Sequence, residues 1–212
     1  MIDLATLATF MAVVLGLFLV PGPAMLLLVT RTAQGGRAVG VATGAGIAAG
    51  DFLHTLLAAF GLSALLMTSA LAFSVVKLCG AAYLLYLGVR AFLAKPSTEA
   101  APHGEAAPGV ISASRAFWQA IPAEMLNPKT ALFFLAFMPQ FVHAERGHAL
   151  AQFLILGLVF VAMSLVYSAA VACAMGPLGR VTRRLRWLQR WKGKLIGTIF
   201  MTLGVRVAFQ QQ

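Results

Sequence analysis

Long apolar runs follow one another along almost the whole sequence, and they limit what the chain can fold into more than any other feature. These runs cover residues 4–30, 38–60, 70–94, 116–141, 149–175 and 195–209. A helix needs about 20 mostly apolar residues to cross the hydrocarbon layer of a bilayer. The runs therefore predict an all-α transmembrane protein of six helices, with five spans as the alternative because the last run is short.

The composition agrees with a membrane protein rather than a soluble one. The chain has 212 residues, of which 60% are hydrophobic and 10% charged, and its mean hydropathy is +0.88. This is more apolar surface than one soluble core could bury. We expect a single membrane domain over residues 1–212, in which a polar cytoplasmic linker, 95–115, separates repeat 1, about 1–94, from repeat 2, about 116–212.

The basic residues are concentrated in the connections between the apolar runs. The net charge is +10, which in a soluble protein would suggest a nucleic-acid partner, but 12 of the 16 basic residues lie in 31–37, 90–115 and 180–194. The positive-inside rule places these connections in the cytoplasm and both termini in the periplasm. Arg180–Lys194 combines seven cations with two tryptophans, a pattern that predicts contact with anionic lipid and no nucleic-acid partner.

Proline interrupts two of the predicted spans at equivalent places. Three spans in each half give the halves opposite orientations, so the sequence predicts two inverted three-helix repeats with broken helices 1 and 4. Such breaks are tolerated where the freed backbone groups line a cavity or are covered by protein. We therefore predict that substrate binds at the residues of both breaks: Pro21, Gly22 and Pro23 in the first, and Asn127, Pro128 and Lys129 in the second. A simple packing kink is the alternative for the breaks, and hydrogen bonding to the freed backbone groups is the alternative for the Asn127 side chain.

Ionisable side chains inside the predicted spans are the second functional signal. An ionised carboxylate in the bilayer interior costs at least about 2.5 kcal/mol, so Asp51 needs a partner or water. Lys77 and Lys129 are its ion-pair candidates, since all three lie at similar predicted depths. Asp51 and His54 share a helix face and could bind a substrate ammonium or a coupling proton; a static Asp–Lys pair is the alternative. Glu124 could line the cytoplasmic entrance.

Other patterns bear on packing and on the class of protein. A stripe of glycines at 36, 40, 44, 46 and 50 predicts close helix packing. The sequence has no H-E-x-x-H, G-x-S-x-G or C-x-x-C motif, so we expect neither an enzyme nor a metal or cofactor site. A passive channel or an accessory membrane protein for small polar solutes remains the alternative to an exporter.

Three stretches together resemble the LysE/RhtB family of bacterial amino acid exporters over nearly the whole chain. They are PGPAMLLLVTRTAQGGRAVGVATGAGIAAGDFLH near the start, VVKLCGAAYLLYLGVRAFL in the third run, and LNPKTALFFLAFMPQF in the fourth. By position, Asp51 matches the acidic residue of the family's second helix, and Asn127-Pro128-Lys129 matches its fourth-helix signature. Pro21-Gly22-Pro23 is similar to the RhtB-type version of the first break.

The resemblance implies a function that the residues alone do not name. It implies secondary export of amino acids or their derivatives across the bacterial inner membrane, by proton-coupled antiport. The RhtB-type first break favours neutral or hydroxylated amino acids over cationic ones. Neither the residues nor the resemblance selects one amino acid, and a homo-oligomer stays open.

Overall fold

The computed structural model describes residues 2–68 and 111–178, together with four isolated helical positions, Val75, Tyr86, Val89 and Leu93. Every regular element in these ranges is helical, which confirms the all-α class. The helices are α1 (Leu4–Leu19), α2 (Pro23–Thr68), α4 (Ala113–Met125), α5 (Pro128–Leu132) and α6 (Ala149–Leu178). After α5 the chain continues through a π-helical segment, Phe133–Phe137, and a 3-10 turn, Met138–Phe141, and a second 3-10 turn, Ala144–Arg146, precedes α6. The predictions for Lys77, for most of the linker, for Arg180–Lys194 and for 195–209 lie outside the described residues.

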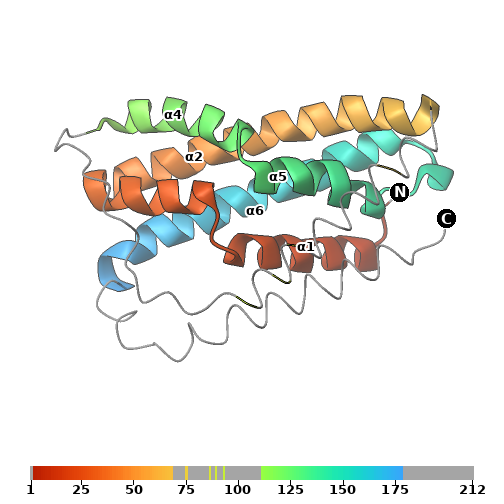
Figure 1. Ribbon diagram of the computed structural model, residues 1–212. Coiled ribbons are helices and arrows are strands. Elements are labelled where there is room, and N and C mark those ends of the chain that lie inside the picture. The colour runs from red at the N-terminus through yellow and green to blue at the C-terminus, as the bar shows by residue number, and fades with distance from the viewer. Residues whose placement is uncertain are drawn as a thin grey trace.

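Gly36 divides α2 into two helical segments that run in opposite directions. Its φ of 75° and ψ of −172° belong to a region that only glycine adopts readily. Thr32 packs against Gly40 across this turn, and Leu28 packs close to Ile47. The reversal separates the first predicted run from the second (Figure 1). Gly36 therefore forms a turn, and the expectation that it packs against a neighbouring helix is wrong.

The other glycines of the stripe let three helices approach closely. A Cβ atom at these positions would collide with the neighbouring helix, so the backbones lie nearer than larger residues allow. The order of the contacting pairs along the chain shows that the second segment of α2 is antiparallel to α6 and parallel to α4. The contacting pairs of the stripe are Gly40 with Ala172, Gly44 with Ser168, Gly46 with Ala120, and Gly50 with Glu124, and Gly157 of α6 adds a contact with Thr55.

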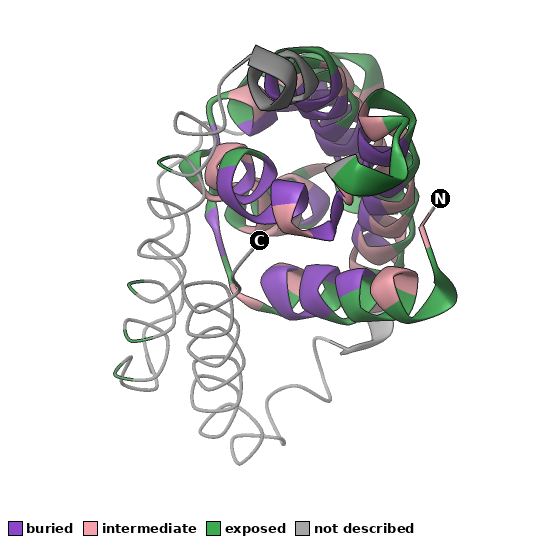
Figure 2. Cartoon of the chain, turned by 90° about the vertical axis from the view of Figure 1, so that its right-hand side faces the viewer, coloured by how far each residue is buried: buried purple, intermediate pink, exposed green. Residues whose placement is uncertain are grey.

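Aromatic side chains fill the core between α1, the π-helical segment and α6. Phe10 lies 5.2 Å from Phe141, ring centroid to ring centroid, and Phe160 lies 5.2 Å from Phe133. In Figure 2 the buried residues face the interior of the helix bundle, and the exposed residues face outward. Two stretches, Pro23–Leu62 and Ala149–Met175, are long and apolar enough to cross a membrane, although Gly36 turns the chain within the first.

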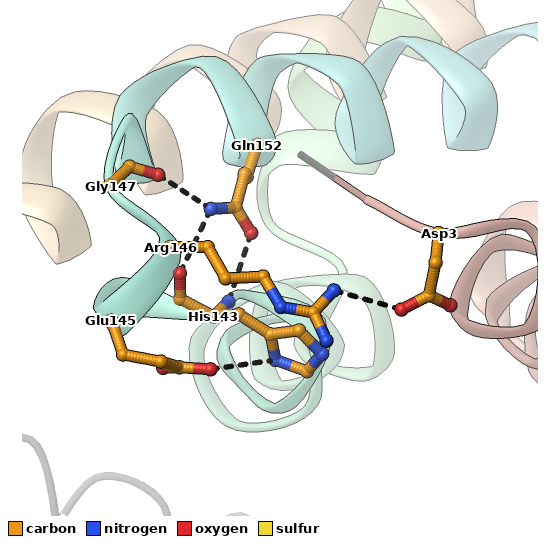
Figure 3. Close-up of polar contacts among 6 residues, drawn as sticks. All are labelled: Asp3, His143, Glu145, Arg146, Gly147 and Gln152. Atoms are coloured by element: carbon orange, nitrogen blue, oxygen red, sulfur yellow. Dashed lines mark hydrogen bonds and ion pairs between the residues drawn. The ribbon is translucent and has the colours of Figure 1, made fainter.

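The beginning of α1 and the turn before α6 meet at one end of the bundle (Figure 3). Asp3 caps α1 by accepting a hydrogen bond from the Thr6 amide at 2.8 Å, and Arg146 Nη1 lies 2.9 Å from Asp3 Oδ2. Arg146 and the Thr6 amide hold the pKa of the Asp3 carboxyl below its usual range. Buried Gln152 closes the turn by bonding both backbone groups of His143.

Candidate functional site

The break after α1 leaves backbone carbonyls that a lysine from the other half of the chain binds. Pro21 has no N–H, so the Leu17 carbonyl lacks its usual helical donor and accepts instead from the Val20 amide at 3.2 Å. Lys129 Nζ donates to the Leu17 carbonyl at 3.1 Å and to the Val20 carbonyl at 2.9 Å. Gly22 leaves room for this side chain, because a Cβ atom there would lie 3.3 Å from Lys129 Nζ. Both ends of the interaction thus depend on residues of the two predicted breaks.

At the break between α4 and α5, a carbonyl is likewise approached by a basic side chain from the other half of the chain. Pro128 cannot donate to the Glu124 carbonyl, which instead accepts from the Asn127 amide at 2.9 Å and lies 3.2 Å from His54 Nε2. The His54 ring also stacks on Phe134, with ring centroids 5.6 Å apart. His54 of α2 therefore lies at the break between α4 and α5, as Lys129 of α5 binds the end of α1.

Asn127 connects this second break to buried polar groups. Its side-chain oxygen caps α5 by accepting from the Lys129 amide at 3.2 Å. Its Nδ2 lies 3.2 Å from both Glu124 carboxyl oxygens and 3.2 Å from the Thr130 hydroxyl. Glu124 is only 2% exposed, so the amide fixes a carboxyl group that the surrounding helices shield from solvent.

A small cavity lies where the two breaks meet. Its volume is about 40 Å³. Asp51 lines it from α2, is 1% exposed, and its Oδ2 has no hydrogen-bond partner among the described residues. The other polar side chains that line it are Glu124, Asn127, Lys129, Thr130, Ser164, Tyr167 and Ser168, and Leu17, Phe18, Ala24, Met25, Leu28 and Ile47 supply its apolar wall. We call it the central cavity.

The structure brings most of the predicted site residues together. Asp51, Glu124, Asn127 and Lys129 line the central cavity. His54 does not line the cavity, and its Nε2 lies 3.2 Å from the Glu124 carbonyl oxygen. The prolines and Gly22 form the breaks that border it. The direct partners of the Lys129 ammonium are carbonyls, and an ion pair of Asp51 with Lys129 or Lys77 stays a prediction.

Four hydroxyl-bearing residues of the cavity were not predicted from the sequence. Thr130 follows Asn127 at i+3, and Ser164 and Ser168 lie at i and i+4 on α6. The Tyr167 hydroxyl donates to the Phe18 carbonyl at 3.0 Å and so binds a third carbonyl at the end of α1. For Ser164, Tyr167 and Ser168, the sequence signal that could have found them is their helical spacing within the apolar run 149–175. No group of three metal-ligating side chains occurs in the described ranges.

Comparison with known proteins gives the family. A family model for the LysE type translocator matches residues 15–211. The chain is 30% identical over 206 residues to an uncharacterized membrane protein of Pseudomonas aeruginosa, covering 94% of this chain and 93% of the relative. It is 30% identical over 194 residues to a homoserine/homoserine lactone efflux protein of Salmonella typhimurium, covering 91% and 90%.

A further relative is a leucine efflux protein of Salmonella choleraesuis, which is 27% identical over 203 residues, or 96% of this chain and 94% of the relative. No solved structure matches the chain significantly. The resemblance carried by the three motifs is thereby confirmed, and with it a multi-pass membrane protein of a transporter family rather than an enzyme family. Because the match extends over most of its length, the chain belongs to the LysE type translocator family.

Proposed function

We propose that the protein is a secondary exporter of amino acids across the bacterial inner membrane, driven by proton influx, with neutral amino acids as its preferred substrates. The relatives named for leucine efflux and for homoserine efflux support the substrate class. The observation that carries the proposal is the central cavity, which lies between two broken helices and is lined by two carboxyl groups and one ammonium group.

The groups lining the cavity complement a zwitterion. The carboxyl groups of Asp51 and Glu124 can accept hydrogen bonds from a substrate ammonium. The Lys129 ammonium has three N–H donors, and two of them bond carbonyls of α1, so one remains for a substrate carboxylate. Leu17, Leu28 and an adjoining methionine offer an apolar wall to an uncharged side chain.

Asp51 is the group we propose for proton coupling. Since its Oδ2 has no hydrogen-bond partner within the described part of the chain, this oxygen can gain a proton without losing an existing bond. A buried carboxylate is costly in the membrane interior unless it is neutralised or paired. Binding either a proton or a substrate ammonium would meet this need, and competition between the two would couple their opposite movements.

The size of the cavity implies that the protein must change conformation to transport. A volume of about 40 Å³ accommodates about three water molecules, whereas an amino acid is larger. We propose that the two inverted halves move relative to each other and open the cavity to each side in turn, with both termini periplasmic. The contacts of Lys129 and His54 across the halves are expected to change in that movement.

The test begins with cells that overproduce the protein. Metabolite profiling of their medium against that of control cells is expected to show enrichment of one or a few neutral amino acids. Everted membrane vesicles should then accumulate the enriched compound, and an uncoupler should abolish accumulation against the gradient. If transport continues unchanged with the uncoupler, the passive channel replaces the exporter.

An Asp51→Asn variant separates binding from coupling in the same vesicles. Asparagine keeps a hydrogen-bond acceptor but cannot exchange a proton. We expect this variant to lose uphill accumulation while it still exchanges internal for external substrate. Full uphill transport by a normally inserted Asp51→Asn protein would exclude Asp51 from proton coupling.

A further inference from the structure

Three carbonyl groups at the end of α1 accept hydrogen bonds from side chains of other helices, and we call them the carbonyl cluster. Two of them, those of Leu17 and Val20, bind the Lys129 ammonium group, and the third, that of Phe18, binds the Tyr167 hydroxyl. The last carbonyls of a helix have no intrahelical donors and carry the negative end of the helix dipole. Here Pro21 cannot donate to the Leu17 carbonyl, which accepts from the Val20 amide at 3.2 Å and has a second lone pair for a cation. Such a cluster can bind an ammonium group or another small cation.

The ligand of this cluster in the structure is part of the protein itself. Lys129 Nζ lies 3.1 Å from the Leu17 oxygen and 2.9 Å from the Val20 oxygen, and the Tyr167 hydroxyl binds the Phe18 oxygen at 3.0 Å. The position is shaped for the lysine side chain, because a Cβ atom on Gly22 would lie within 3.4 Å of its Nζ, Cε and Cδ atoms.

The carbonyl cluster adjoins the space in which the substrate is proposed to bind. Leu17 and Phe18 line the central cavity, as do Lys129 and Tyr167. A substrate with a second cationic group would therefore meet the fixed Lys129 ammonium at the carbonyls that could otherwise bind it. A substrate with one ammonium and one carboxylate avoids this repulsion and can use the remaining N–H of Lys129.

We propose that Lys129 is a tethered cation that occupies the carbonyl cluster and thereby excludes substrates with a cationic side chain, which makes it a specificity-determining residue. This inference rests on the proposed export function. It assigns the residues of the two breaks a joint role: the first break supplies carbonyls and space, and the second supplies the ammonium group that fills them.

Lys129→Ala tests the inference by emptying the position. Purified variant is expected to gain thermal stability on addition of ethylammonium chloride, relative to sodium chloride at equal ionic strength, whereas the parent protein gains none. Lysine binding should rise about tenfold or more, since a charge-assisted hydrogen bond at this position is restored by the ligand. In vesicles, ethylammonium should restore part of the lost transport of the neutral amino acid.

Three further variants control for loss of structure. Lys129→Arg keeps a tethered cation, so lysine should remain excluded and ethylammonium should have no effect. Tyr167→Phe removes a neutral donor from the same cluster, and it should show neither effect. Lys129→Met keeps the length of the side chain but not its charge, and it should admit lysine even if the alanine variant does not insert.

The experiment distinguishes a failure of this inference from a failure of the proposed export function. If neither Lys129→Ala nor Lys129→Met gains lysine binding, and ethylammonium stabilises neither more than it does the parent protein, the inference is wrong. If ethylammonium stabilises Lys129→Ala but the parent protein exports no amino acid, the carbonyl cluster is a cation site and the proposed function fails instead.

Discussion

Pro21 and Pro128 each remove one backbone donor, and in each case a basic side chain from the other half of the chain joins a neighbouring backbone amide at the affected carbonyl. Lys129 binds the carbonyl affected by Pro21, and His54 lies at hydrogen-bonding distance from the carbonyl affected by Pro128. Unsatisfied carbonyls are costly where no water reaches them. At the residue scale, the two breaks are thus stabilised by each other's half.

His54→Phe tests this compensation for the second break. Phenylalanine can keep the stacking on Phe134 but cannot bond the Glu124 carbonyl. That carbonyl retains the Asn127 amide, so we expect a loss of about 1 kcal/mol in the free energy of unfolding, the usual net value of one hydrogen bond. Unfolding in detergent measures the change, and an unaltered or higher stability would show that the contact contributes nothing.

The sequence was sufficient to locate the breaks but not their partners. A proline inside an apolar run can be read directly, and α1 ends at Leu19 just before the predicted interruption. The residue that binds a freed carbonyl lies far away in the chain: 112 positions separate Lys129 from Leu17. Such a pairing depends on tertiary packing, which helical periodicity alone does not specify.

At the scale of elements, glycine serves two different purposes in α2. Gly46 packs against α4, where a Cβ atom would lie 2.8 Å from the Ala120 Cβ atom. Gly36 instead permits the sharp reversal between the two segments. The even spacing of glycines at 36, 40 and 44 suggested one packing stripe, because residue spacing within a helix says nothing about where that helix begins.

Gly46→Ala tests the close approach of α2 and α4. The added methyl group would overpack the interface, and we expect a loss of about 1–3 kcal/mol in stability. Gly61→Ala is the matched control, because a Cβ atom there meets no described atom within 4 Å and alanine favours the helix by up to about 1 kcal/mol. Equal effects of the two substitutions would contradict the packing described.

At the scale of the whole molecule, the described contacts fit alternating helix directions. The second segment of α2 runs parallel to α4 and antiparallel to α6, as expected for spans two, four and five of the predicted six. The full inverted repeat stays a prediction, because span six and all but four positions of span three fall outside the described residues. The Asp3–Arg146 pair places the chain start and the turn before α6 at one end.

Low pH should release this contact between the chain start and the turn. The pKa of Asp3 is lowered in the folded protein, so its contribution to stability is complete above the ordinary carboxyl pKa of about 3.9 and is lost as the pH falls through the lowered value. The difference in Tm between the parent protein and Asp3→Asn should be constant from about pH 8 to 5 and shrink below about pH 4. A difference that is unchanged down to pH 3 would contradict the assignment.

The central claim is that the exported amino acid binds in the central cavity, and substrate protection of a thiol tests it most directly. Ser168→Cys, in a protein whose Cys79 and Cys173 are replaced by alanine, places a single thiol in the cavity wall. Glu145→Cys in the same background gives an exposed control. The exported amino acid should slow alkylation of Cys at 168 in a concentration-dependent way and leave the control unaffected; equal alkylation rates with and without saturating substrate would contradict the account.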